Sequence, residues 1–95
     1  MVRILIADDH EMLRRGLIQT LERHPNWEIC GEASNGREAV ELAEKTLPNV
    51  ALLDLSMPQM NGLEATRAIK KASSNTEIMI LTVHETDSLI REVLE

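Results

Sequence analysis

The sequence contains almost no aromatic side chains, because Trp27 is the only one and phenylalanine and tyrosine are absent. A core must therefore be built from aliphatic residues, which the 43% hydrophobic content can supply. The single cysteine, Cys30, excludes an internal disulfide and fits a reducing compartment. No apolar run approaches the roughly 18 residues of a membrane span, and no signal-peptide pattern is present. We therefore expect a soluble, cytoplasmic protein without membrane contacts.

Positive charge is also in short supply, with 10 lysines and arginines against 16 acidic residues and a net charge of -6. A general nucleic-acid or membrane surface would need a basic footprint, which this chain lacks. Glycine-rich nucleotide-binding fingerprints and the nucleophile elbow of hydrolases are absent too. Ninety-five residues allow one domain, and a small one.

Short apolar runs alternate with helix-like patterns along the chain. Val2–Ala7 and residues 50–53 are nearly continuous apolar runs, as is 78–83, which is typical of strands covered on both faces. Residues 28–32 alternate polar and apolar side chains, which predicts a half-exposed edge strand. Strands that alternate with helices in this way predict an α/β fold with a parallel sheet.

The segments between the predicted strands carry helix signals. Capping boxes are predicted for Asp8 with Glu11, Asn35 with Glu38, and Asn61 with Glu64. The apolar stripes expected to face the sheet are Leu13, Leu17 and Leu21; Ala39, Val40 and Ala43; and Leu63, Thr66 and Ile69. A fourth stripe is formed by Leu89, Ile90, Val93 and Leu94, after which the chain stops.

Acidic and hydroxyl side chains stand at the ends of three predicted strands. Asp8 and Asp9 follow the first strand, Asp54 follows the strand at 50–53, and Thr82 lies near the end of 78–83. The ends of parallel strands converge at one edge of an open α/β sheet, where such folds place their ligands. Carboxylates gathered there repel each other unless a hard cation lies between them, and Mg²⁺ suits this oxygen-rich site. A carboxylate beside a cation and a hydroxyl could accept a phosphoryl group.

Each of these residues also has a purely structural explanation. Asp8 could act only as a helix N-cap, Asp54 could be a buried carboxylate satisfied by backbone N–H groups, and Thr82 could be an ordinary β-branched strand residue. Two adjacent acids and a third on another strand exceed the needs of capping, so a functional site is the better interpretation. The histidines lack metal-ligand spacing and are expected to be solvated: His10, His24 and His84.

Four segments, ILIADDHEMLRRGL, GEASNGREAVELA, PNVALLDLSMPQMNGLEATRAI and IMILTVHE, resemble the receiver domain of bacterial two-component response regulators. The resemblance is greatest to the subfamily whose full-length members carry a C-terminal helix-turn-helix DNA-binding domain. It covers essentially all 95 residues, with the acidic pair, the later aspartate and the threonine in order. The fold implied is a doubly wound parallel sheet with the flavodoxin-like strand order 2-1-3-4-5.

The resemblance also implies roles for individual residues. Asp54 would be the phosphoacceptor, with a sensor histidine kinase as the donor. Thr82, followed by Val83, would bind the phosphoryl group and act as the switch. The implied Mg²⁺ ligands are Asp9, Asp54, the backbone carbonyl of Ser56 and, largely through water, Asp8. A separate phosphohydrolase reading is disfavoured, because Ser56 stands where such an enzyme would have a general acid.

One departure from the family pattern concerns the end of the chain. Family members carry a phosphoryl-contacting lysine on a fifth strand, whereas nothing follows Glu95 here. We therefore expect residues 1–95 to be a receiver that lacks the fifth strand, the fifth helix, the catalytic lysine and any output domain. Activity would then be limited to self-phosphorylation from small donors and slow autodephosphorylation, and DNA would be bound only through an output domain.

Two further expectations follow from the same departure. The alternative function is an interaction module that keeps the fold but cannot complete the phosphorylation cycle. The unpaired edge of the fourth strand would also be a template for another chain, so a homodimer or an exchange of strand and helix through residues 78–95 is expected.

Overall fold

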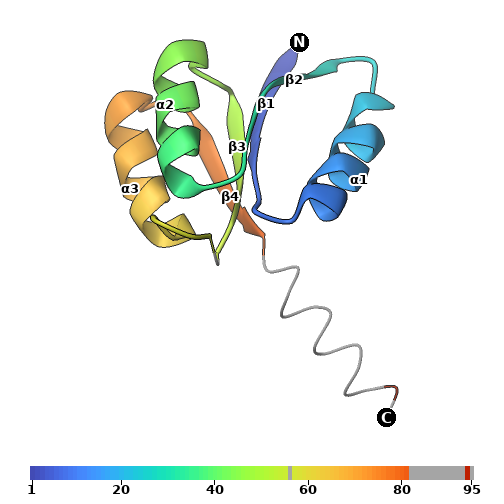
Figure 1. The fold of residues 1–95 in the computed structure, drawn as a ribbon. Coiled ribbons are helices and arrows are strands. Elements are labelled where there is room, and N and C mark those ends of the chain that lie inside the picture. Colours follow the sequence, from blue (N-terminus) through green and yellow to red (C-terminus); the bar gives the residue numbers. More distant parts are fainter. Residues whose placement is uncertain (56, 82–93, 95) are drawn as a thin grey trace.

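The computed structural model describes residues 1–55, 57–81 and 94, and it shows one parallel sheet between helices (Figure 1). The strands are β1 (Val2–Ala7), β2 (Trp27–Ala33), β3 (Val50–Asp54) and β4 (Glu77–Leu81), and the helices are α1 (Glu11–Glu22), α2 (Gly36–Thr46) and α3 (Gly62–Ala72). The strand order is β2-β1-β3-β4, and all neighbouring strands are parallel. The predicted doubly wound α/β fold, with strands in the order 2-1-3-4, is confirmed.

Helices cover the sheet from both sides, with α1 on one face and α2 and α3 on the other (Figure 1). Successive strand residues point to opposite faces. In β1, Leu5 and Ala7 therefore join the cluster under α2 and α3, whereas Ile4 and Ile6 join the cluster beside α1. This two-sided burial explains why the β1 sequence is a nearly continuous apolar run rather than an alternating one.

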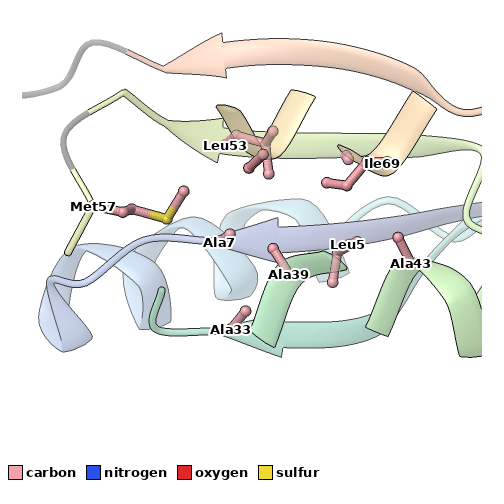
Figure 2. Packing of buried hydrophobic residues seen from close by; sticks show 10 residues of the cluster. Leu5, Ala7, Ala33, Ala39, Ala43, Leu53, Met57 and Ile69 are labelled. Carbon is pink, nitrogen blue, oxygen red and sulfur yellow. The ribbon is translucent and has the colours of Figure 1, made fainter. Parts of the chain in front are cut away.

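Small side chains dominate the contact of α2 and α3 with the sheet. Ala39, Ala43 and Ala65 are completely buried, so the helix backbones lie close to the strands. Leu53 of β3 and Ile69 of α3 fill the remaining space (Figure 2). The scarcity of aromatic residues is thus matched by close packing of backbones rather than by bulky side chains.

Two of the predicted apolar stripes are partly wrong, in one residue of α1 and in two residues of α3. Leu13 of α1 is 43% exposed, while Leu17, Ile18 and Leu21 pack against the sheet. Leu63 of α3 is 58% exposed. The buried stripe of α3 is Gly62, Ala65 and Ile69. The error in α3 arises because small residues were not counted as core, and one position along a helix turns a side chain by about 100°.

The predicted N-caps divide into two correct assignments and one error. The side chains of Asn35 and Asn61 accept hydrogen bonds of 2.9 Å from the backbone N–H groups of Glu38 and Glu64. The capping box at Asp8 is wrong, because α1 begins at Glu11 with His10 as its N-cap and no side-chain cap bond. Asp8 and its neighbour therefore stay in the loop after β1.

The sheet edges are β2 on one side and β4 on the other among the described strands. The predicted half-exposed edge strand at 28–32 is confirmed as part of β2. The strand predicted for 78–83 corresponds to β4, and Thr82 and Val83 lie outside the described residues. Most of the predicted fourth stripe lies outside them too, and only Leu94 is described. Within the described ranges, no helix is long and apolar enough to cross a membrane.

Candidate functional site

Four polar side chains meet at the C-terminal edge of the sheet. Asp8, Asp9, His10 and Asp54 each offer one possible ligand atom, and these atoms all lie within 4.8 Å of one another. The register of the sheet explains the meeting, because Ala7 of β1 pairs with Leu53 of β3 and the next residue on each strand is an aspartate. The expected convergence of the three carboxylates at the strand ends is present in the structure.

Two of these carboxylates are buried. Asp8 is 2% exposed and Asp54 is 1% exposed, while the Asp9 side chain is 30% exposed. Like charges gathered in a poorly solvated place destabilise the fold unless an opposite charge compensates them. Three carboxylate groups are also the hard oxygen donors that Mg²⁺ prefers, with one side open to water. The residues present therefore fit a magnesium ion.

His10 takes a place that the sequence interpretation missed. Its Nδ1 atom lies 3.0 Å from an oxygen of Asp9 and 3.6 Å from an oxygen of Asp8, although the side chain is 48% exposed. The expectation of an ordinary solvated histidine was therefore incomplete. Its position directly after the acidic pair was the available signal. The other described histidine, His24, stacks on Trp27 with ring centroids 4.0 Å apart.

Asp8 is fixed through three of its polar groups. Its backbone N–H donates to the carbonyl of Ala33 at the end of β2, at 3.0 Å. Its side-chain Oδ1 accepts from the backbone N–H of His10 at 2.8 Å. Its backbone carbonyl accepts from Nη1 of Arg14 at 2.7 Å. The acidic loop after β1 is thus tied to β2 and to α1.

The chain after Asp54 is fixed from both sides of the loop. Leu55 donates its N–H to the carbonyl of Leu81, at 3.3 Å, and accepts from the N–H of Gly62 at 3.0 Å. Met57 is 7% exposed and points into the core near Ala7 (Figure 2). Ser56 lies outside the described residues, so its predicted carbonyl ligand is not placed.

The strand that leads to Thr82 runs beside Asp54. Leu81 is the direct partner of Asp54 in the β3–β4 ladder, and Thr82 follows it in the sequence. Thr82 and Val83 themselves are outside the described residues. The position of Leu81 agrees with the expectation that β3 and β4 end at the same edge of the sheet.

An apolar groove of about 490 Å³ opens beside the acidic cluster on the α1 side. It is lined by Asp8, Met12, Leu13, Gly16, Leu17, Thr20 and Leu81. Met12 is 88% exposed, so the groove offers accessible apolar surface next to a buried carboxylate.

Comparison with known proteins identifies relatives over almost the whole chain. Residues 4–95 match the family described as response regulator receiver domain. The transcriptional regulatory protein LiaR of Bacillus subtilis is 45% identical over 95 residues, which are the whole of this chain and 45% of that protein. The chain thus spans less than half the length of this relative.

Solved structures also resemble this chain. A DNA-binding response regulator of the LuxR family from Staphylococcus aureus has a TM-score of 0.78 and 38% identity, covering 84% of this chain and 67% of that one. A CheX–CheY–BeF3–Mg²⁺ complex from Borrelia burgdorferi has a TM-score of 0.77 and 25% identity, covering 83% and 60%. Since the family match extends over nearly all residues, the chain belongs to the receiver domains of response regulators.

Proposed function

We propose that Asp54 accepts a phosphoryl group from the phosphohistidine of a sensor histidine kinase. The observation that carries this proposal is the position of Asp54, buried at the end of a central strand with Asp8 and Asp9 beside it. A buried carboxylate in such company is costly for stability, which favours a chemical use over a structural one.

The reaction requires little from the protein except positioning. An oxygen of Asp54 attacks the phosphorus, the bond between phosphorus and the donor imidazole nitrogen breaks, and the nitrogen keeps the electron pair. The product is an acyl phosphate on Asp54. Catalysis of such transfers rests on placing the groups and on stabilising the charge of the phosphoryl oxygens. The hydrogen bonds that hold Asp8 and the loop after Asp54 supply that placement.

Magnesium is the proposed cofactor. Asp9, Asp54 and the backbone carbonyl of Ser56 would hold it, and Asp8 would contribute largely through water. When bound, the ion offsets negative charge on the phosphoryl group and on the carboxylates. The Borrelia burgdorferi relative was solved as a complex with both BeF3 and Mg²⁺, which supports an acidic pocket that takes a cation and a phosphoryl analogue together.

The response to phosphorylation is assigned to the residues after β4. Thr82, followed by Val83, would bind the phosphoryl group and change the local conformation, which is how phosphorylation switches commonly act. Relatives such as LiaR are transcriptional regulatory proteins. In a longer protein of this kind, the receiver would control transcription in the cytoplasm, with DNA contacts made by an output domain.

The groove beside Asp8 is the proposed contact for the kinase. It places exposed apolar side chains of α1 next to the acidic cluster, so a partner bound there could present its phosphohistidine to Asp54.

Beryllofluoride, an analogue of the phosphoryl group, tests the proposed phosphorylation of Asp54 without a kinase. Titration with Mg²⁺ and beryllofluoride, followed by fluorine NMR, should give a bound signal that disappears when Mg²⁺ is chelated. Absence of a bound signal would contradict the proposal and favour the interaction module without phosphorylation.

Replacing Asp9 with Asn should weaken Mg²⁺ binding by roughly tenfold or more, because a charged oxygen ligand becomes a neutral one. The matched control is Glu11→Gln, which also removes one negative charge but changes a side chain that bonds Arg15 on exposed α1. Calorimetry is preferred to tryptophan fluorescence for this measurement. Trp27 pairs with Val2 at the end of the strands opposite the acidic cluster, so its fluorescence is a poor reporter of binding there. Equal affinities of Asp9→Asn and Glu11→Gln would contradict the ligand assignment.

The edge of β4 is the proposed site of self-association. Among the described strands β4 pairs only with β3, and Met79 on this edge strand is 57% exposed. Unpaired strand edges with apolar side chains favour pairing with another chain. We expect dimers, or an exchange of strand and helix between chains, through residues 78–95. Sedimentation should then show species with a larger mass than the monomer.

A charge on this edge should shift the equilibrium to monomer, so Met79→Lys tests the proposed surface. Leu63→Lys is the control, because Leu63 is equally exposed but lies on α3. If both variants sediment like the parent, β4 is not the site of association.

A further inference from the structure

We propose that Arg14 is a positioning residue for the acidic pair, which deepens the function proposed above and rests on it. Arg14 lies in the first turn of α1, where its backbone N–H donates to the carbonyl of His10. Its guanidinium group donates to the backbone carbonyl of Asp8 at 2.7 Å. The same group donates from Nε to a carboxylate oxygen of Glu32 on β2, at 3.0 Å.

The bond to Asp8 acts on both acids because of peptide geometry. The carbonyl of Asp8 and the N–H of Asp9 belong to one planar unit. A donor that holds this carbonyl fixes the orientation of the plane, and the plane in turn sets the directions in which both side chains leave the backbone. Arg14 thereby determines where the two carboxylates lie without touching either carboxylate or the ion.

Glu32 gives the guanidinium group a second anchor. Arginine presents its donors in a rigid planar fork, so two acceptors on different elements fix its orientation. The Arg14 side chain is 13% exposed, whereas Glu32 is 51% exposed. The arrangement ties the loop after β1 to α1 and to β2, and the inner contact, to Asp8, is the shielded one.

The next residue shows what an arginine without this role looks like. Arg15 is 70% exposed and bonds only Glu11, one turn earlier on the same helix, among the interactions described for it. An exposed pair of this kind contributes little to stability. Arg14→Gln and Arg15→Gln remove the same charge from adjacent positions, so they form a matched pair.

The test compares Mg²⁺ affinity, by calorimetry on the whole chain, in the parent and in three variants. Arg14→Gln should weaken binding by roughly tenfold, the usual effect of losing a group that orients a metal ligand. Arg15→Gln should change it by less than about twofold. Arg14→Lys keeps the charge but not the fork, and should recover only part of the loss. Equal affinities of the two glutamine variants, or full recovery by lysine, would overturn the inference.

A second measurement does not depend on the metal. In chelator, amide hydrogen exchange of His10, whose N–H donates to Oδ1 of Asp8 at 2.8 Å, should be roughly tenfold faster in Arg14→Gln than in Arg15→Gln, because release of the peptide plane weakens this hydrogen bond. If the parent binds no Mg²⁺ but this difference appears, the proposed cofactor is wrong and the positioning role stands. If Arg14→Gln does not fold, Glu32→Gln replaces it, with a smaller change expected in the same direction. No change in exchange at the His10 amide in either variant would overturn the inference.

Discussion

Replacing Asp54 with Asn should abolish phosphoryl uptake and, in metal-free buffer, make the protein more stable. The loss of uptake follows from removing the attacking oxygen of the proposed phosphoacceptor. The gain in stability has an electrostatic cause, since the Asp54 carboxylate lies among those of Asp8 and Asp9 and is itself buried. An amide of the same shape relieves the repulsion between like charges.

The expected increase in the free energy of unfolding is about 1–2 kcal/mol, well below the ideal Coulomb repulsion, because the structure relaxes and Asp9 is partly solvated. For a domain of this size, that raises the melting temperature by roughly 4–16 °C. Thermal unfolding in chelator measures this change in melting temperature. Glu28→Gln, on the exposed start of β2, is the control for the loss of one charge. Added Mg²⁺ should reduce the difference in melting temperature between the variant and the parent, because the ion stabilises the parent. A variant that melts well below the parent would show that the Asp54 carboxylate stabilises the metal-free fold.

Replacing Gly36 with Ala should destabilise the fold strongly. Gly36 is the first residue of α2, and an added Cβ would lie 2.2 Å from the carbonyl oxygen of Met60 and 2.7 Å from its Cβ. The obstacle includes backbone, which cannot move aside as a flexible side chain would. We expect a loss of about 3 kcal/mol in the free energy of unfolding. Because Met60 lies in the loop between β3 and α3, the chain that follows Asp54 must shift as well.

Gly16 provides a control with the opposite sign. It lies on exposed α1, and an added Cβ there meets nothing within 4 Å. Gly16→Ala should therefore stabilise the protein by about 0.5–1 kcal/mol through the better helix propensity of alanine. Urea unfolding of both variants gives the two free energies. A small effect of Gly36→Ala, comparable in size to that of Gly16→Ala, would mean that α2 can move away from the loop without cost.

The strands and their parallel arrangement could be predicted because the sequence patterns are local and periodic, whereas the strand order was implied by the resemblance to receiver domains. The β1 run Val2–Ala7 is apolar at nearly every position, which is what a strand buried on both faces requires. The caps at Asn35 and Asn61 were equally readable, since each is followed three residues later by a glutamate. The convergence of Asp8, Asp9 and Asp54 followed from the expectation that their strands are parallel neighbours.

What could not be predicted depends on packing between elements. Leu63 fits a helical stripe, but the small residues Gly62 and Ala65 are the ones that meet the sheet, and apolar size is a poor guide where backbones pack closely. Asp8 fits a capping box, but its side chain bonds the His10 N–H instead, which delays the start of α1. The bond of Arg14 to the Asp8 carbonyl leaves no sequence pattern, because the acceptor is backbone.

Asp54 is the proposed acceptor of the phosphoryl group. Incubation of the chain with acetyl phosphate and Mg²⁺, reduction of the acyl phosphate with borohydride, and peptide mass analysis locate it directly. We expect one modified residue, at Asp54, with no modification when Mg²⁺ is chelated. Modification at Asp8 or Asp9 instead, or none in the presence of Mg²⁺, would contradict it.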